Sequence, residues 1–120
     1  MYLDHVSDAT IKALYQGALC LAFPSRYEGF GLPPIEAMAC GCPVIVSRAA
    51  SMPEVCGNAA LYCDPDLPET LAAGIRRLLC DRDLRTKLIL RGTERARQFS
   101  WDASARKLLD IVRATTPIAT

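Results

Sequence analysis

Two glutamates and two glycines that lie close together are the residues of this sequence best suited to chemistry. Glu28 and Glu36 enclose a short segment that contains Gly29 and Gly31. A carboxylate can accept two hydrogen bonds at once, which suits the vicinal hydroxyls of a ribose or another sugar. Glycine lets the backbone approach a ligand closely. The segment therefore indicates a site for a ligand rich in hydroxyl groups.

The elements around this segment are predicted to place it at the start of a helix. Residues 32–40 form that helix, because prolines are tolerated in a first turn and Gly41 follows as a cap. The amides at such a helix start, together with the helix dipole, favour a diphosphate. Glu36 lies one turn further on and faces the same end. The backbone groups predicted to meet the ligand are those of Gly29, Phe30, Gly31 and Leu32. Ribose, diphosphate and sugar occur in this order in a nucleotide-sugar.

Each of these features also has a plainer interpretation. Two glycines separated by one residue are common, and a glutamate on a helix is usually a solvated surface residue. Glu28 taken alone could simply cap the helix that follows it. The hypothesis of a ligand site therefore rests on the whole string and not on any single residue of it.

The first half of the chain alternates between short apolar runs and helical stretches, which is typical of a parallel sheet built from βα units. Strands are expected at 20–23, 43–47 and 60–63. Helices are expected after the cap residues Ser7 and Asp8, at 32–40 and at 51–56. The predicted fold class is α/β, with a Rossmann-like parallel sheet and flanking helices.

The C-terminal third is predicted to be wholly helical. Helices are expected at 68–80 and 83–98, a last one begins after Ser100 and reaches about 114, and residues 115–120 are expected to fray. We describe residues 1–120 as a single partial domain with a helical tail at about 68–114. Three strands are fewer than the five or six of a doubly wound sheet, so we expect the second half of a Rossmann-like domain.

The composition excludes several classes of protein. The chain has 120 residues, of which 51% are hydrophobic and 22% charged, as in ordinary soluble globular domains. It contains neither the roughly 20 apolar residues of a membrane span nor a signal peptide, so we expect a cytoplasmic protein. Its six cysteines lack C-x-x-C spacing and His5 is the only histidine, which favours buried free thiols over disulfides or a metal site.

Charge is distributed unevenly along the chain. Residues 1–66 carry three basic and seven acidic side chains, whereas residues 67–120 carry eleven and six. The basic half is either a solvated helix surface or a region attracted to another domain or to anionic lipid, and the last option would bring the protein to a membrane surface. Nucleic acid is not an expected partner, because the basic residues are not interleaved with aromatic ones and form no binding motif.

The segment around the two glutamates resembles a known family motif. Residues 28–39 match the E-x7-E motif of the group 1 (family 4) glycosyltransferases. The similarity covers essentially the whole chain, with further matches at 6–8, 23–25, 40–45, 53–55 and 57–60.

This resemblance implies a GT-B architecture, in which two Rossmann-like domains enclose the active site and this chain forms part of the C-terminal, donor-binding domain. It implies transfer of a sugar from a nucleotide-diphosphate-sugar to an acceptor in carbohydrate biosynthesis, with retention of configuration and with neither a metal nor a cofactor. Glu36 would bind the ribose, while Glu28 and the backbone from Gly29 to Leu32 would meet the sugar and the phosphates. Glu28 would be the catalytic residue, as a nucleophile or as a stabiliser of charge, and we favour the second role.

Two parts of the family pattern do not occur in this sequence: the acceptor-binding N-terminal domain and the first part of the C-terminal domain, which carries basic contacts to the diphosphate. We therefore expect the chain alone to be inactive and to need the missing half as a partner. We also expect it to self-associate through a sheet edge and apolar surface near Leu3, Leu21 and Val44. The alternative is a non-catalytic module that binds a nucleotide-sugar or another partner. A sugar-nucleotide epimerase of similar architecture fits less well, because it would not carry the E-x7-E motif.

Overall fold

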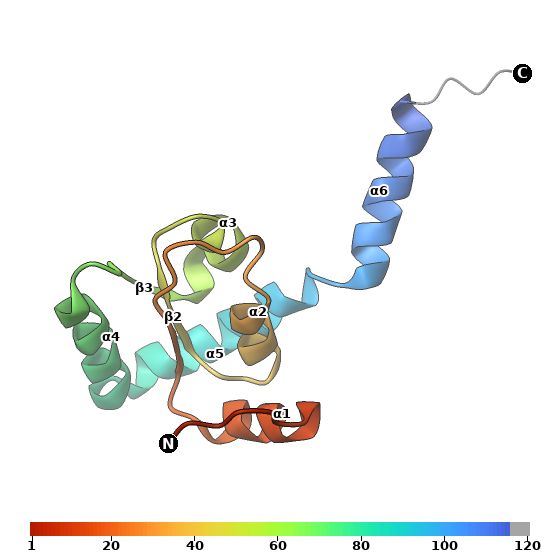
Figure 1. Cartoon of the computed structure of the whole chain (residues 1–120). Helices are drawn as coiled ribbons and strands as arrows, with labels where there is room; N and C mark the ends of the chain where they lie inside the picture. Colours follow the sequence, from red (N-terminus) through yellow and green to blue (C-terminus); the bar gives the residue numbers. More distant parts are fainter. Residues whose placement is uncertain (116–120) are drawn as a thin grey trace, which may run out of the picture.

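A three-stranded parallel sheet forms the centre of the computed structural model, which describes residues 1–115. The strands are β1 (Leu21–Phe23), β2 (Val44–Ser47) and β3 (Leu61–Cys63), in the order β1-β2-β3. Leu21 is paired with Val44, and Ile45 with Leu61. Helices lie on both sides of this sheet (Figure 1), so the prediction of a Rossmann-like parallel sheet is confirmed.

In the first half of the chain, the start of α1 and the end of α2 lie beside the cap residues that the sequence indicates. Helix α1 (Asp8–Gly17) starts after Ser7, whose Oγ accepts the amide of Thr10 at 3.2 Å. Helix α2 (Leu32–Ala39) is followed by Gly41, which has a φ of +75°. A short helix α3 (Met52–Cys56) and a 3₁₀ turn η1 (Gly57–Ala59) lead into β3. This left-handed backbone conformation after α2 strongly favours glycine.

Three longer helices make up the C-terminal third, as predicted. They are α4 (Pro68–Cys80), α5 (Arg82–Arg97) and α6 (Trp101–Thr115). The Oγ of Ser100 accepts the amide of Ala103 at 3.0 Å and so caps α6. The prediction that Thr115 frays is wrong, because it ends α6 and its Oγ1 donates to the carbonyl of Ile111 at 2.8 Å. The same prediction for residues 116–120 lies outside the described residues.

The core lies on the two faces of β2, all of whose residues are buried. Side chains of a strand alternate between faces, so Val44 and Val46 contact the cluster built from α2 and α3, whereas Ile45 contacts Leu78 of α4 and Leu88 of α5. Val44 was expected near uncovered apolar surface, and this expectation is wrong. The side chain is 0% exposed because β1 and the helices cover the strand.

Helix α5 approaches α2 and the sheet closely, and glycine makes this approach possible. A Cβ atom at Gly92 of α5 would lie 3.1 Å from the Cγ of Met38 in α2, tighter than ordinary van der Waals contact. At Gly74 of α4, a Cβ atom would lie 3.2 Å from the Cδ1 of Ile45. These two contacts fix how closely the C-terminal helices sit against the sheet and α2.

All six cysteines are free thiols, and five of them are at least partly buried. Burial raises the pKa of Cys42 and of Cys56 to about 11, which makes these thiols unreactive near neutral pH. Cys80 is the exception to the predicted burial, because it lies exposed at the end of α4.

The two ends of the described chain pack differently from its middle. Neither α1 nor α6 has a buried residue. Helix α6 projects away from the body of the molecule (Figure 1), which measures 63 × 30 × 30 Å overall. Within residues 1–115, strand β1 is paired with β2 alone, and its central residue Ala22 is exposed. No helix within residues 1–115 combines the length and the apolar character that crossing a membrane requires.

Candidate functional site

The loop of residues 24–31 joins the carboxyl end of β1 to the start of α2. Serines of neighbouring elements hold its backbone. Ser47 at the end of β2 donates to the carbonyl of Ser25, and Ser51 before α3 donates to the carbonyl of Glu28 at 3.3 Å. The loop therefore lies at the edge of the sheet where open α/β proteins bind their ligands.

Glu28 is half-buried within this loop. The Oγ of Ser25 lies 3.3 Å from its Oε1 and donates to it. The same hydroxyl lies 2.9 Å from the carbonyl of Tyr27. In residues 1–115 no lysine or arginine forms an ion pair with this carboxylate. Glu28 is thus a carboxylate that accepts a hydrogen bond from a neutral donor at the carboxyl edge of the sheet.

Gly31 sets the geometry at the start of α2. Its φ is +90°, and a Cβ atom there would overlap the Cε of buried Met52. The first amides of a helix lack intrahelical acceptors, and here Pro33 and Pro34 have no N–H at all. The donors that remain at this helix end are the amides of Gly31 and Leu32, which continue those of the loop.

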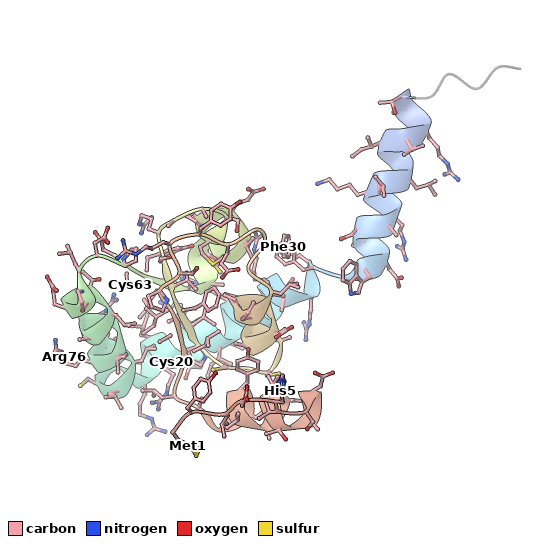
Figure 2. The ribbon with its side chains drawn as sticks, in the orientation of Figure 1. Met1, His5, Cys20, Phe30, Cys63 and Arg76 are labelled. Carbon is pink, nitrogen blue, oxygen red and sulfur yellow. The ribbon has the colours of Figure 1, made fainter. Side chains whose placement is uncertain are left out.

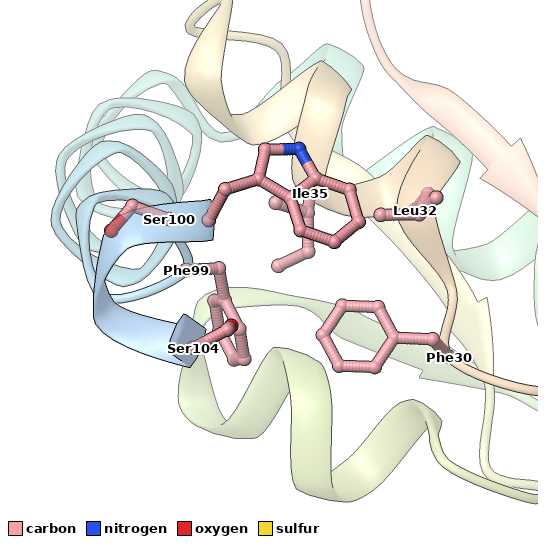
Figure 3. A pocket seen from close by; sticks show the side chains of 7 residues that line it. Phe30, Leu32, Ile35, Phe99, Ser100 and Ser104 are labelled. Atoms are coloured by element: carbon pink, nitrogen blue, oxygen red, sulfur yellow. The ribbon is translucent and has the colours of Figure 1, made fainter. Parts of the chain in front are cut away.

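The side chains of Phe30 and Leu32 lie beside the junction of α5 and α6. Figure 2 shows Phe30 on the side of the body from which α6 projects. The two residues line an apolar hollow of about 310 Å³ together with residues of α2 and of the α5–α6 junction (Figure 3). The Phe30 and Phe99 rings meet edge to face, with centroids 5.6 Å apart and planes at 77°.

Glu36 opens onto a different hollow, of about 380 Å³, between α1 and α2. Residues of α1 form its other wall, among them Lys12 and Tyr15. Burial raises the pKa of the Tyr15 phenol, and the Glu36 carboxylate raises it further. The structure thus brings Glu36 beside α1, and it does not place Glu36 in the hollow that Leu32 lines.

Tyr15 and Lys12 were not among the predicted site residues. In the sequence, Tyr15 fits the apolar spacing of a helix together with Ile11 and Ala18, and this pattern by itself assigns the side chain to a packed face. The signal that was available is the combination of a phenol and an ammonium one turn apart on a helix that precedes the motif. Periodicity alone does not reveal that this face meets α2.

The two basic residues nearest the motif are engaged elsewhere. Arg26 forms an ion pair with Asp66, in the turn after β3. The guanidinium of Arg48 lies over the ring of Tyr62, 4.5 Å from its centroid. Within residues 1–115 no group of three His, Cys, Asp or Glu side chains is suited to hold a metal ion.

A parallel sheet with a glycine-containing loop at its carboxyl edge and an E-x7-E pair on that loop and its helix defines part of a Rossmann-like, GT-B type domain. The profile of the family described as glycosyl transferases group 1 matches residues 1–95. This chain therefore belongs to the group 1 glycosyltransferases.

Individual relatives agree with this assignment. The O-antigen chain mannosyltransferase B of Escherichia coli is 45% identical over 101 residues, which are 84% of this chain and 26% of the relative. The MMP alpha-(1->4)-mannosyltransferase of Mycolicibacterium hassiacum is 40% identical over 88% of this chain and 27% of its own length. The solved structure of sucrose-phosphate synthase from Thermosynechococcus elongatus superposes with a TM-score of 0.84 at 32% identity, and the match covers 95% of this chain and 29% of that one. The chain thus spans between 26% and 29% of the length of these three proteins.

Proposed function

We propose that this chain binds the nucleotide-diphosphate-sugar donor of a retaining glycosyltransferase of hexosyltransferase type. The observation that carries the proposal is the loop of residues 24–31, which we call the donor loop. Gly31 takes a φ of +90° at the start of α2, where the amides of Gly31 and Leu32 have no acceptor within the helix, and a glutamate lies on either side of them in the sequence. Amides at a helix start favour the diphosphate, and they offset charge that grows on it as the sugar departs.

The nucleoside would occupy the hollow between α1 and α2. Glu36 accepts hydrogen bonds from the ribose hydroxyls there, and Tyr15 and Lys12 form the opposite wall. A volume of about 380 Å³ lies within the usual range for small-molecule sites, about 300–1,000 Å³. The donor then runs from this hollow across the start of α2 to Glu28.

Glu28 would act on the sugar, as a group that stabilises positive charge on the reacting carbon. A preorganised carboxylate is effective in this role because it does not reorganise during the reaction. We assign it no metal partner and no cofactor. The less favoured alternative is that Glu28 attacks the sugar as a nucleophile.

The acceptor would bind to a second, N-terminal domain, which this proposal assigns to the part of the relatives that the chain does not span. The 120-residue chain alone should transfer no sugar. Positioning of both substrates can contribute about 7–11 kcal/mol in enzymes, and one half of a cleft does not supply it. We place the enzyme in the cytoplasm, where the basic helices α4, α5 and α6 form either a solvated surface or its contact to a membrane surface or another domain.

A binding experiment tests the donor assignment directly. The chain is titrated with a panel of GDP- and UDP-sugars, beginning with the mannose donors because two relatives named above are mannosyltransferases. Glu36→Ala should lower donor affinity about ten- to a hundredfold, since a hydrogen bond to a charged group contributes about 1.5–3 kcal/mol. Glu69→Ala, an exposed glutamate of α4, is the matched control and should bind normally.

The division of roles is tested in the enzyme completed with its acceptor-binding half. Glu28→Ala should depress kcat, because interactions beside the reacting carbon tighten in the transition state. Glu36→Ala should mainly raise KM for the donor. If both variants changed KM alone, this division would be wrong. A completed protein that binds donors and transfers nothing would instead be a non-catalytic binding module.

A further inference from the structure

Arg95 of α5 is the most fully engaged arginine near the donor loop, although 64 residues or more separate it from that loop in sequence. Each of its guanidinium nitrogens donates to a different acceptor. Nε donates to the carbonyl of Val55 at 2.8 Å, and Nη2 to the carbonyl of Glu54 at 2.5 Å. Nη1 donates to the Oε1 of Gln98 at 2.8 Å. The plane and position of this guanidinium are therefore fixed from three sides.

The first effect of these bonds is on α3. The last carbonyls of a helix have no intrahelical partner, and Arg95 satisfies two of them in a helix of only five residues. The start of the same helix holds the donor loop, because Ser51 donates to the carbonyl of Glu28 and Met52 packs against Gly31. Fixing the end of α3 thus fixes the element against which the loop lies.

A second connection runs through the aromatic rings. The guanidinium of Arg95 lies over the ring of Phe99, 5.0 Å from its centroid. Phe99 in turn meets Phe30 edge to face, as Figure 3 shows. Phe30 stands between the two glycines of the donor loop, so its ring is the side chain through which that stretch of backbone is held.

We propose that Arg95 is a positioning residue for the donor loop, acting on the backbone of Gly29 to Gly31 through α3 on one side and through Phe99 and Phe30 on the other. This proposal rests on the proposed function for the identity of the ligand. A backbone with two glycines samples many conformations, and amides that bind a diphosphate must be held close to their productive geometry. Arginine suits the task and lysine does not, because a planar fork can donate to two carbonyls while its face lies on a ring.

The test uses the 120-residue chain and three variants. Arg95→Ala removes both connections, and Arg95→Lys keeps the charge without the fork. Arg91→Ala is the matched control, because Arg91 lies one turn earlier on α5, is exposed and donates at 3.4 Å to the carbonyl of Asn58. Thermal unfolding identifies the temperature range in which every variant is folded. Phe99→Leu breaks only the aromatic connection and serves if Arg95→Ala does not fold.

The first measurement needs no ligand. In Arg95→Ala the amide resonances of Gly29 and Gly31 should shift or broaden and exchange faster with solvent, Arg95→Lys should show the same change, and Phe99→Leu should show part of it. Arg91→Ala should leave both resonances in place. Unchanged glycine resonances in folded Arg95→Ala, or in Phe99→Leu where that variant replaces it, would overturn the proposal.

The second measurement is donor affinity, with the nucleotide-sugar of the GDP and UDP panel that the wild-type chain binds best. Arg95→Ala should weaken it about tenfold, the change that 1.4 kcal/mol produces, and Arg91→Ala should not. Equal affinity in the two variants would refute positioning while leaving the proposed function intact. If the wild-type chain binds no nucleotide-sugar and the glycine resonances still respond to Arg95→Ala, the proposed function fails and the positioning role of Arg95 stands.

Discussion

The sequence predicts both α2 and α6 as helices, but α2 packs into the core of the molecule, whereas α6 has no buried residue. Four residues of α2 are buried against the sheet, α3 and α5, and they are Pro34, Ile35, Ala37 and Met38. Helix α6 buries none, although it carries Trp101, Leu108 and Ile111, which are all exposed. An apolar periodicity therefore predicts that a helix forms, but it does not tell whether the partner of the apolar face lies in the same chain.

The candidate site is built from both buried and exposed elements. The donor loop is held by buried or half-buried elements, namely β2, α3 and the end of α5. In each of the two adjoining hollows, one wall comes from α2, and the outer wall comes from α1 or from the start of α6, which have no buried residues. Packed elements thus hold the backbone where the diphosphate is proposed to bind, whereas the outer walls of the site belong to helices without buried residues.

The largest effect is expected at the centre of the packed region. Ile45 of β2 is 0% exposed and contacts α4 and α5. Ile45→Ala should lower the free energy of unfolding by about 2–5 kcal/mol, because it removes buried methyl groups and leaves a cavity. Urea denaturation followed by circular dichroism measures this. A loss below about 0.5 kcal/mol, the usual range for surface sites, would show that the middle of the sheet is as loosely packed as the ends.

A smaller effect is expected at the junction between loop and helix. Gly31→Ala introduces a Cβ at φ +90° and against Met52, so it should cost about 1–3 kcal/mol of stability. Donor binding should fall more than stability does, because the loop amides change direction. Gly17→Ala is the control, since a Cβ at that exposed position would meet no atom within 4 Å. Equal donor affinity in the two variants would show that ligand binding does not depend on the φ of Gly31.

The exposed edge of the sheet is expected to promote self-association of the chain. In the part of the chain that the structure describes, one edge of strand β1 is unpaired, and such edges recruit partners unless a charge protects them. We expect the chain to self-associate as its concentration rises. Ala22→Lys, at the exposed centre of β1, should reduce this association without loss of helical signal. Light scattering that shows a strict monomer for the wild-type chain at high concentration would contradict the expectation.

The smallest effect is expected on α6. Leu108→Ala should change the free energy of unfolding of the chain by less than about 0.5 kcal/mol, because the side chain is 63% exposed. The same denaturation experiment as for Ile45→Ala provides the measurement. A loss of 2 kcal/mol or more would mean that α6 packs against the body in solution, and the contrast with α2 would disappear.

The sequence predicts the elements well because their signals are local. Ser7, Gly41 and Ser100 each end or begin a helix at the expected place, since capping depends on residues within one turn. The predicted start of α5 at 83 is one residue late, because the cap is Asp81, whose carboxylate accepts the amide of Leu84 at 2.9 Å.

Contacts between distant elements are what the sequence did not reveal. The proximity of Glu36 to Tyr15 depends on how α1 packs on α2. The connection from Arg95 to Phe30 crosses three elements. The burial of Val44 depends on how α2, α3 and Ala96 of α5 pack together against the strand. The roles of Glu28, Gly29, Phe30, Gly31, Leu32 and Glu36 in donor binding stay predictions.

The two prolines at the start of α2 have a thermodynamic consequence of their own. Pro33 and Pro34 each hold φ near about −65°, so this turn already has few conformations in the unfolded chain. Folding gives up less entropy here than at the glycines of the donor loop, which lie only two to four residues away. A stretch with much freedom to lose is thus joined directly to one with little. If the donor binds as proposed, the backbone entropy that it removes from this segment should therefore come mainly from the loop side of residue 33, and a calorimetric comparison of variants can assign it to a few peptide units.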